Sequence, residues 1–484
     1  MNRYTAVFLS LLAVTPWASA ELVTYPAGKD VTTIDDYAVR VRQADGPWQP
    51  VDVYPVKVQR VNPTAESAGN TVETASMAYF DFDGGPVDVE IVPRRGGAPE
   101  AVRVRPLSYG IAHSLSGDTI RMTLERPCNL SVEVNGDIFH NLHLFANPID
   151  ANRPSAKVLR NLKKHRSLMY FGPGVHRLAG DTLRVPSGTT VYVDGGARVT
   201  GTLIADGVSD VNFFGRGEVH PEGRGEGVYI KNSRRVKADG IIVTQIPVGG
   251  SDSVSVTNVK SISSYGWGDG MNVFASDNVS YDGVFCRNSD DCTTVYATRK
   301  GFSGGCRNIT MRNSTLWADV AHPVMIGLHG NAEGCDTIQN LLYQNLDILD
   351  HQERQIDYQG CMAISCGDNN LVRDVTFDNI RVEDFRRGQL VNIRIFFNKK
   401  YCAAPGLAIE NVLFKDVTYN GSNAEMSVIC GYDAGHRVSG VTFENLTING
   451  LRISDDMPGK PKWYKTGDFA RFYIGEHVDG VVFK

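Results

Sequence analysis

Three aspartates lie in a short part of the chain that is rich in acidic and aromatic residues. Asp269 belongs to the run Tyr265-Gly-Trp-Gly-Asp-Gly, and Asp290 and Asp291 follow in the run Asn288-Ser-Asp-Asp-Cys. Carboxyl groups gathered in one groove repel one another, which raises the pKa of at least one of them. A protonated carboxyl beside ionised ones is the acid–base set that glycosidic bond cleavage needs.

The same aspartates also fit a purely structural role, because Asp in Gly- and Asn-rich segments commonly forms turns. Asp269 precedes Asp290 by 21 residues, close to one turn of a coiled chain, so the two positions can lie on neighbouring strands. Adjacent residues of a regular strand face opposite ways, so Asp290 and Asp291 act together only if the chain bends there. The spacing alone leaves both roles open.

A repeating pattern of short strands, starting near residue 160, surrounds these aspartates. Segments such as Asn308-Ile-Thr-Met and Gly440-Val-Thr-Phe recur. The first apolar residue of each repeat falls at 211, 279, 309, 341, 375, 412 and 441, and shorter coils fit near Val236 and Val259. Repeats of this length with two or three strands each are typical of stacked coils, whereas a propeller blade needs four strands.

We therefore predict an all-β protein in which residues 156–484 form a right-handed parallel β-helix that carries the catalytic site. Val, Ile and Leu should stack inside it, and Asn side chains at the turns should bond one another's backbone. Residues 21–155 show short alternating strands, for example at 37–42, 87–92 and 130–134, and the last is followed by the hairpin signal Asn135-Gly136. These residues predict an N-terminal β-sandwich.

The first 20 residues have the pattern of a signal peptide. Arg3 gives a positive start, an apolar run follows, and Ala18-Ser-Ala20 fits a cleavage site. The run is too short to span a bilayer, and no later stretch is long and apolar enough. We expect a secreted or periplasmic protein with no membrane segment after cleavage.

Composition narrows the class of partner. The chain has 484 residues, 21% of them charged, with a net charge of −5, which argues against a nucleic-acid partner. Its nine cysteines show no zinc-type spacing, and their odd number leaves at least one thiol free. We predict no metal and no cofactor, and we expect a polysaccharide substrate along the flank of the coil. Nothing in the sequence indicates an oligomeric state.

The aspartate motifs resemble a known clan of enzymes. The run W-x-D-G, followed one coil later by N-x-D-D, is similar to the β-helical glycoside hydrolases of family 28 (polygalacturonases) and family 49 (dextranases and isopullulanase). Residues 308–317, 322–327 and 134–145 resemble family 49, the last in its N-terminal sandwich. The resemblance implies that Asp290 is the general acid, that Asp269 and Asp291 activate water, and that the reaction inverts the anomeric centre without a metal.

The resemblance also has departures that bear on the substrate. The histidine of the family 28 Gly-His-Gly motif is matched by His329, which lies 39 residues after Asp290, with His322 as a competing match. The family 28 Arg-x-Lys pair, which holds a galacturonate carboxylate, is reduced here to Arg394-Ile-Phe396. Without the second cation an anionic sugar loses a contact, which favours a neutral α-glucan of the dextran or pullulan type.

The residues expected to bind substrate are the aromatic, basic and histidine side chains near the aspartates, each of which also fits a packing role: His329, Trp267, Tyr296, Lys300, Trp317 and His322. Second-tier candidates are Arg299, Asp319, Arg354 and Asp357. Three alternatives remain: a pectin-type hydrolase acting on galacturonan, a β-helical lyase with a Lys or Arg base and calcium, and a non-catalytic carbohydrate-binding rod.

Overall fold

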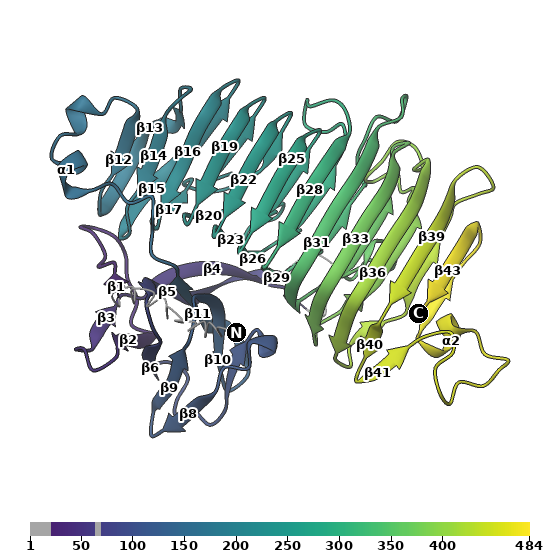
Figure 1. The fold of residues 1–484 in the computed structure, drawn as a ribbon, viewed down its shortest axis with the longest axis horizontal. Helices are drawn as coiled ribbons and strands as arrows, with labels where there is room; N and C mark the ends of the chain where they lie inside the picture. The colour runs from purple at the N-terminus through teal and green to yellow at the C-terminus, as the bar shows by residue number, and fades with distance from the viewer. Residues whose placement is uncertain (1–20, 63–68) are drawn as a thin grey trace, which may run out of the picture.

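The computed structural model describes residues 21–62 and 69–484, so the predicted signal peptide lies outside the described residues. The chain is almost entirely β: two small sheets precede a sheet of 30 strands that winds along the rest of the chain. Figure 1 shows the small sheets packed below the N-terminal half of a long coil. The all-β prediction, with a sandwich followed by a parallel β-helix, is confirmed.

The N-terminal sheets form a sandwich. The six-stranded sheet consists of β1 (Glu21–Thr24), β4 (Tyr54–Arg60), β5 (Thr71–Asp83), β7 (Val102–Arg105), β10 (Cys128–Val134) and β11 (Asp137–Asn147). The five-stranded sheet consists of β2 (Tyr37–Gln43), β3 (Gln49–Val51), β6 (Val87–Pro93), β8 (His113–Ser116) and β9 (Thr119–Leu124). Alternate residues of both sheets, such as Val39, Val89, Phe80 and Leu142, meet in one apolar core, as expected for two facing sheets.

The β-helix begins after the short helix α1 (Ala156–Leu159). Its first coils contain β12 (Leu168–Phe171), β13 (Gly174–Arg184), β14 (Thr190–Val193) and β15 (Ala197–Asp206). The strands then form three parallel columns. The first column is β16 (Ser209–Gly215), β19 (Arg234–Asp239), β22 (Asp252–Thr257), β25 (Asp277–Asp282), β28 (Cys306–Arg312), β31 (Thr337–Asp350), β33 (Leu371–Glu383), β36 (Ala408–Asn420), β39 (Arg437–Glu444) and β43 (Val478–Phe483).

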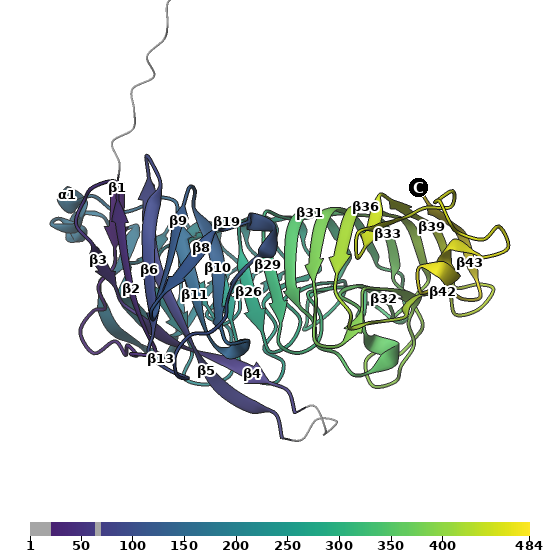
Figure 2. The ribbon, with the colours of Figure 1, turned by 90° about the horizontal axis from the view of Figure 1, so that it is seen from below.

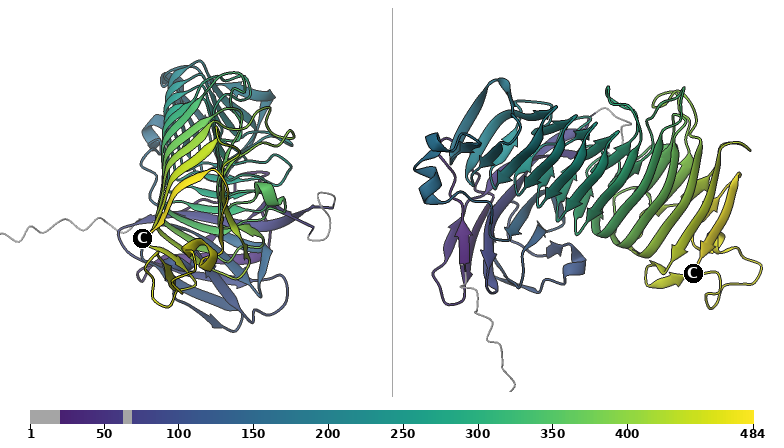
Figure 3. Two further views of the ribbon diagram at one scale, coloured as in Figure 1. Left: turned by 90° about the vertical axis from the view of Figure 1, so that its right-hand side faces the viewer. Right: turned by 45° about the horizontal axis from the view of Figure 1, so that its top comes forward.

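The other two columns hold the shorter strands. One is β17 (Glu218–His220), β20 (Ile242–Val243), β23 (Lys260–Ile262), β26 (Phe285–Asn288) and β29 (Thr315–Ala318). The other is β18 (Val228–Lys231), β21 (Val248–Gly249), β24 (Met271–Phe274), β27 (Thr293–Tyr296), β30 (Val324–Ile326), β32 (Met362–Cys366), β35 (Val391–Ile395), β38 (Ser427–Cys430) and β42 (Phe472–Ile474). The remaining elements are β34 (Gly388–Gln389), β37 (Ala424–Glu425), β40 (Leu446–Ile448), β41 (Leu451–Ile453) and α2 (Thr466–Phe469). Seen along its length, the rod shows its coils nearly superposed (Figure 3, left).

The predicted apolar row is present in the interior. Strand pairing places the following residues opposite one another from coil to coil: Val211, Val236, Val254, Val279, Ile309, Leu341, Val375, Val412 and Val441. All of them are buried. In the short coil expected near Val259, Val254 is the residue that continues the row, and Val259 is buried just before β23. Stacking of equivalent residues keeps the register constant, so each coil orients its turns as the previous coil does.

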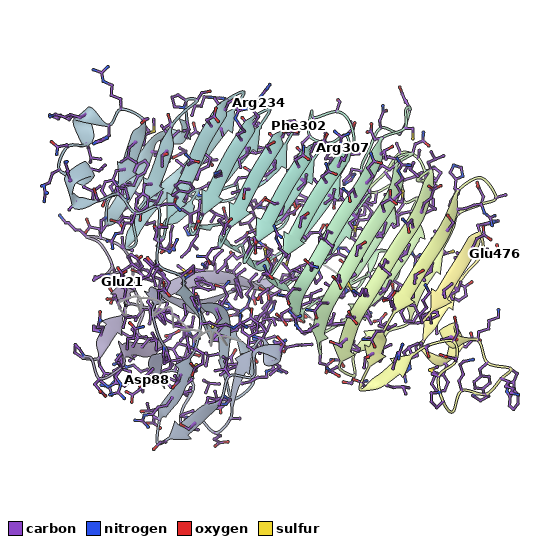
Figure 4. The ribbon with its side chains drawn as sticks, viewed as in Figure 1. Glu21, Asp88, Arg234, Phe302, Arg307 and Glu476 are labelled. Atoms are coloured by element: carbon purple, nitrogen blue, oxygen red, sulfur yellow. The ribbon has the colours of Figure 1, made fainter. Side chains whose placement is uncertain are left out.

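Asn residues stack at the turns, but not as predicted. Asn308 and Asn340 have φ values of 59° and 57°, in the left-handed region that Asn tolerates better than most residues. The Nδ2 group of Asn308 donates to Oδ1 of Asn278 at 2.8 Å. We call this row of stacked Asn residues the Asn ladder; its hydrogen bonds join side chains to side chains and not to the backbone. The ladder is exposed, and Arg234 and Arg307 lie along the same upper edge of the long column (Figure 4).

The sandwich packs against the β17–β29 column. Tyr54, Val56 and Phe145 of the sandwich share an apolar cluster with Ile262 and Phe285 of the coil. Figure 2 shows the β4–β5 hairpin extending from the sandwich alongside the middle coils. The two parts therefore present a continuous surface on the flank where the short strands turn.

A buried ion pair of the coil lies at the same contact and is hydrogen-bonded to the sandwich. Arg287 and Asp319 are fully buried, 3.0 Å apart, and the Arg287 guanidinium also donates to the Asn141 amide oxygen of the sandwich at 2.8 Å. All nine cysteines are free thiols. In the described part of the chain, no helix has the length and apolar character needed to cross a bilayer.

Candidate active site

The three predicted aspartates come together at equivalent turns of two neighbouring coils. Asp269 lies between β23 and β24, and Asp290 and Asp291 lie between β26 and β27. Met271 pairs with Thr293, and the N–H of Gly270 donates to the carbonyl oxygen of Asp291 at 2.8 Å. Because both strands of each pair end before the turn, the chain bends at Asp290 and Asp291, as their joint action requires.

Glycine is needed on both sides of Asp269. A Cβ atom on Gly270 would lie 2.5 Å from the Asn288 amide oxygen and 2.5 Å from the carbonyl oxygen of Cys292. A Cβ atom on Gly268 would lie 2.3 Å from the Ser289 hydroxyl oxygen. The two glycines let one coil approach the next closely enough for the carboxyl groups to interact.

Asp291 is the deepest of the three aspartates, with 3% of its surface exposed. Its Oδ1 accepts hydrogen bonds from the backbone N–H of His322 at 3.1 Å and from the His322 ring Nδ1 at 2.6 Å. Its Oδ2 accepts the hydroxyl of Tyr296 at 3.1 Å. Both carboxylate oxygens therefore have donors, which holds the group in one orientation.

His322 is a cation in this arrangement. Its Nδ1 faces the Asp291 carboxylate and its Nε2 faces the carbonyl oxygen of Tyr358, so both ring nitrogens need a proton to be satisfied. Burial disfavours the charged ring, but the Asp291 charge and its hydrogen bond outweigh burial, and the pKa of His322 is raised. The imidazolium compensates one negative charge inside the cluster.

Asp269 and Asp290 keep their protons more strongly than ordinary carboxyl groups. Burial, followed by the charge of Asp291, raises the pKa of Asp269 to about 6, although the Asn272 amide donates to its Oδ2 at 2.7 Å. Burial, followed by the charges of Asp269 and Asp291, raises the pKa of Asp290 well above its ordinary value. The cluster thus places Asp290, a carboxyl group with a raised pKa, beside two further carboxyl groups, an arrangement suited to acid–base cleavage.

Four of the predicted binding residues lie around the aspartates. Trp267 is 78% exposed, with φ of 60°, which is uncommon for a bulky residue and is maintained at the turn that holds Asp269. The exposed Lys300 opposes the rise in the pKa of Asp269, so its charge acts on the cluster. Tyr296 holds Asp291, and the ring of His329 packs edge-on against Tyr296 at 4.9 Å.

His329 is neutral. Burial, followed by the charge of Arg299, lowers the pKa of its ring to about 3. With 8% of its surface exposed, His329 lies behind Tyr296 and not at the surface of the groove. Its contacts are those of a residue that positions Tyr296.

Two of the predicted binding residues are fully buried. Trp317 is fully buried beneath the sandwich, where the Arg287 guanidinium lies 4.1 Å from the centre of its ring. His322 is fully buried and both of its ring nitrogens are used inside the protein. The structure corrects both expectations: neither side chain is available to a sugar, because the sandwich covers one and the next coil covers the other.

Several side chains near the aspartates had no signal in the sequence. Tyr358 packs edge-on against His322 at 4.5 Å and stacks on Tyr401 at 4.6 Å, and its carbonyl oxygen accepts from His322. The charge of Glu353 contributes to the raised pKa of Asp290. These residues lie in irregular loops after β31 and β35, where no repeat predicts their position.

Two hollows flank the aspartates along the coil. The first, of about 440 Å³, reaches Ser263 and Tyr265 in the turn before Asp269. The second, of about 510 Å³, is lined by Val320 and Glu353, close to the coil of His322. Among residues 21–62 and 69–484, no group of three or more His, Cys, Asp or Glu side chains is arranged to hold a metal ion. The site is thus an elongated cleft with the acidic cluster between two hollows.

Comparison with known proteins supports a glycoside hydrolase site. The family model described as "Glycosyl hydrolases family 28" matches residues 236–458, a segment that contains all three aspartates. Endopolygalacturonase A of Aspergillus niger is 22% identical over 297 residues, which are 59% of this chain and 72% of that protein. A probable endopolygalacturonase A of Aspergillus kawachii is 22% identical over 245 residues, 49% of this chain and 59% of that protein.

A solved structure shares the whole architecture. Dex49A from Penicillium minioluteum matches 95% of this chain and 96% of its own, with a TM-score of 0.59 and 14% sequence identity. At this identity the match concerns the fold: a sandwich followed by a β-helix in one arrangement. The chain therefore has an N-terminal sandwich followed by a β-helix, and most of the β-helix matches the family 28 glycosyl hydrolase model.

Proposed function

We propose that the protein hydrolyses an α-linked polysaccharide, a neutral glucan of the dextran or pullulan type, by single displacement. The observation that carries this proposal is the geometry of the cluster: the three aspartates lie at equivalent turns of two neighbouring coils, burial and the charges of Asp269 and Asp291 raise the pKa of Asp290, and Asp291 is hydrogen-bonded to His322. Hydrolysis of a glycosidic bond needs one acid and one base.

Asp290 acts as the general acid in this proposal. Its Oδ1 accepts the N–H of Asp291 at 3.1 Å, so the proton is carried by Oδ2. That proton passes to the glycosidic oxygen as the bond to the anomeric carbon breaks, and the departing sugar leaves with a hydroxyl group. The Asp290 carboxylate regains a proton from solvent before the next turnover.

Asp269 and Asp291 activate the attacking water. Asp291 has donors on both oxygens and cannot swing towards the anomeric carbon, which favours a role in orienting water over a role as nucleophile. Asp269, with one oxygen bound by Asn272, accepts the proton of the water with its other oxygen. Attack from the face opposite the leaving group inverts the anomeric configuration.

The choice of a neutral sugar rests on the strands beside the cluster. Along the column that follows Asn272 the paired positions are Thr294, Met325, Ala363 and Asn392. These positions are buried and carry no charged side chain, so this column supplies no cation for a sugar carboxylate. Arg394, two residues after Asn392, is half-buried and donates to the Asn392 amide oxygen at 2.9 Å.

A pectin-type hydrolase is the second candidate, supported by the names of the Aspergillus relatives and by the family 28 match. Lys300 and Arg299 are exposed basic groups that follow the paired aspartates in the chain, the charge of Lys300 acts on Asp269, and both would be available to a galacturonate carboxylate. Release of reducing sugar from dextran and pullulan, measured beside polygalacturonate, distinguishes the two candidates. Turnover of polygalacturonate alone would refute the glucan proposal.

The catalytic roles are tested with Asp290→Asn and the matched control Asp282→Asn, which changes an aspartate at the end of β25 that pairs with Arg312. We expect Asp290→Asn to reduce kcat by about 10³-fold or more with KM nearly unchanged, because proton transfer contributes about 10²–10⁴-fold and binding is retained. Asp282→Asn should retain the wild-type rate. NMR of the first product formed should show the inverted anomer.

The outcomes also separate the remaining classes. A lyase would form unsaturated products that absorb in the ultraviolet and would lose activity with a chelator. A binding rod would retain polysaccharide without turnover and would be indifferent to Asp290→Asn. Full activity of Asp290→Asn would remove the basis for the assignment of the acid.

A further inference from the structure

The β4–β5 hairpin of the sandwich lies beside both hollows that flank the aspartates. Pro55, Val56 and Lys57 line the first hollow, and Val61 and Asn70 line the second. The step from residue 56 to residue 61 along a strand covers roughly 17 Å, and neighbouring coils are about 4.8 Å apart. The hairpin therefore passes both hollows and crosses the middle coils obliquely (Figure 2).

The hairpin is held against the coil at the level of the site. The backbone N–H of Gln59 donates to the Asp319 carboxylate at 3.3 Å, and the Arg354 guanidinium donates to the carbonyl oxygen of Asn62. Arg354 itself lines the second hollow, together with Glu353 and Tyr401. The hairpin is thus hydrogen-bonded to the loops that surround the cluster, and these bonds fix its position relative to the coil.

The first hollow carries paired charges at its base. Glu218 is 1% exposed and accepts from the Arg198 guanidinium at 2.6 Å and from the His220 ring at 3.0 Å. Lys57 faces the same hollow from the sandwich, and its Nζ donates to the Thr74 hydroxyl at 2.6 Å. Neutralised pairs of this kind present donors and acceptors together, which suits sugar hydroxyl groups, since each hydroxyl both donates and accepts.

We propose that the sandwich domain forms one wall of the substrate cleft, so that sugars on both sides of the cleaved bond lie between the β4–β5 hairpin and the coil. This inference rests on the proposed function and extends it: Lys57, Arg198 and Thr200 bind sugar units in the first hollow, and Asn70, Arg354 and Tyr401 bind units in the second. The lining of the first hollow includes Ser263 and Tyr265, and Tyr265 lies four residues before Asp269 in the same turn.

The test compares a variant that fills the first hollow with a matched variant elsewhere on the coil. Thr200→Trp places an indole in the hollow from the outward face of β15, and Thr376→Trp places one on the outward face of β33, far along the rod. Lys57→Ala removes the hairpin cation, and Lys237→Ala removes an exposed lysine of β19 that lines neither hollow. Thermal melting establishes that all four proteins fold.

The measured quantities are kcat/KM on the polysaccharide and on a series of its oligosaccharides, and Kd for the polysaccharide in the Asp290→Asn background. We expect Thr200→Trp to lower kcat/KM on the polymer about tenfold and to raise Kd similarly, with a loss that grows with chain length. Lys57→Ala should lower kcat/KM about threefold on the polymer, and both controls should match the wild type.

The outcomes distinguish failure of the proposed sandwich wall from failure of the proposed function. If the wild type cleaves the polymer and Thr200→Trp and Lys57→Ala match their controls in kcat/KM and Kd, the sandwich wall is refuted and the proposed function stands. If the wild type binds polysaccharide without cleaving it, the Kd series still tests the wall. If it neither binds nor cleaves any polysaccharide of the panel, both the proposed function and the wall are refuted.

Discussion

Replacement of His322 by glutamine tests how the site divides its protons. The ring is fully buried, and its two nitrogens face the Asp291 carboxylate and the Tyr358 carbonyl oxygen, both of which only accept. Glutamine keeps an N–H donor for one of these partners but carries no charge. The substitution therefore removes one positive charge from a cluster that contains Asp269, Asp290 and Asp291.

The size of the effect follows from the hydrogen bond between His322 and Asp291, which is 2.6 Å long. A hydrogen bond to a charged group contributes about 1.5–3 kcal/mol, against about 1 kcal/mol for a neutral one. The difference is about 0.5–2 kcal/mol, which corresponds to a change in pKa of about one unit. With less positive charge nearby, the carboxyl groups of the cluster hold their protons more tightly. The acidic limb of the pH profile of kcat/KM, which reports the base Asp269, should therefore move to higher pH by about one unit.

The assay is the pH dependence of kcat/KM for wild type, His322→Gln and the matched control His351→Gln. His351 is equally buried and its ring centre lies 5.9 Å from that of His322. Burial, followed by the charge of His322, lowers the pKa of His351 to about 3, so its ring is already neutral. We expect the control to change stability without moving the limb. An unmoved limb in His322→Gln, or equal movement in both variants, would refute the reasoning.

Three further predictions follow from the geometry. First, wild-type kcat/KM should be bell-shaped in pH: activity rises as the base Asp269, with a pKa of about 6, loses its proton, and falls at higher pH as the acid Asp290 loses its own, which a pH-rate profile checks. Second, Arg287→Met leaves the buried Asp319 without its closest partner and should reduce the free energy of unfolding, measured by urea denaturation, by about 3–5 kcal/mol. The control Arg235→Gln changes an exposed pair and should leave the urea midpoint nearly unchanged. Third, Asn345→Ala should reduce the free energy of unfolding by about 1–2 kcal/mol, because φ at this position is 55° and two side-chain hydrogen bonds of the Asn ladder are lost. Asn345→Gly should reduce it by less, because glycine adopts the left-handed conformation readily. Equal losses in both variants would show that the left-handed backbone is not the cause.

The fold was predictable because each coil repeats one local rule. A single apolar residue of each repeat, from Val279 to Val441, must point inward, and period-2 alternation then sets the orientation of its neighbours. The shorter coils were harder, because β20 and β21 have two residues each and offer little alternation to align. In the short coil near Val259, both Val254 and Val259 are buried, but only Val254 pairs within the long column.

The acidic cluster was predictable from its spacing, while the roles of its neighbours were not. The 21 residues between Asp269 and Asp290 reflect one coil, a local property of the chain. The burial of Trp317 depends on the sandwich, and that of His322 on the loop of Tyr358, so both depend on contacts between segments far apart in the sequence. Tryptophan and histidine occur both in sugar-binding sites and in packed interiors, so only the tertiary contacts show which role a given side chain has.

The pair Asp290-Asp291 has a physical reason in the turn that carries it. Because the chain bends there, one carboxyl points to the next coil and the other stays at the surface of the cleft: Asp291 is 3% exposed and Asp290 is only half-buried. The inner carboxylate obtains its counter-charge from His322, one coil further on, and its own charge raises the pKa of the outer one. A turn with a single aspartate would lose this contribution, and only burial and the charge of Asp269 would then raise the pKa of Asp290. The second aspartate thus strengthens the first as an acid, and the stacking of coils supplies the histidine that holds the second in place.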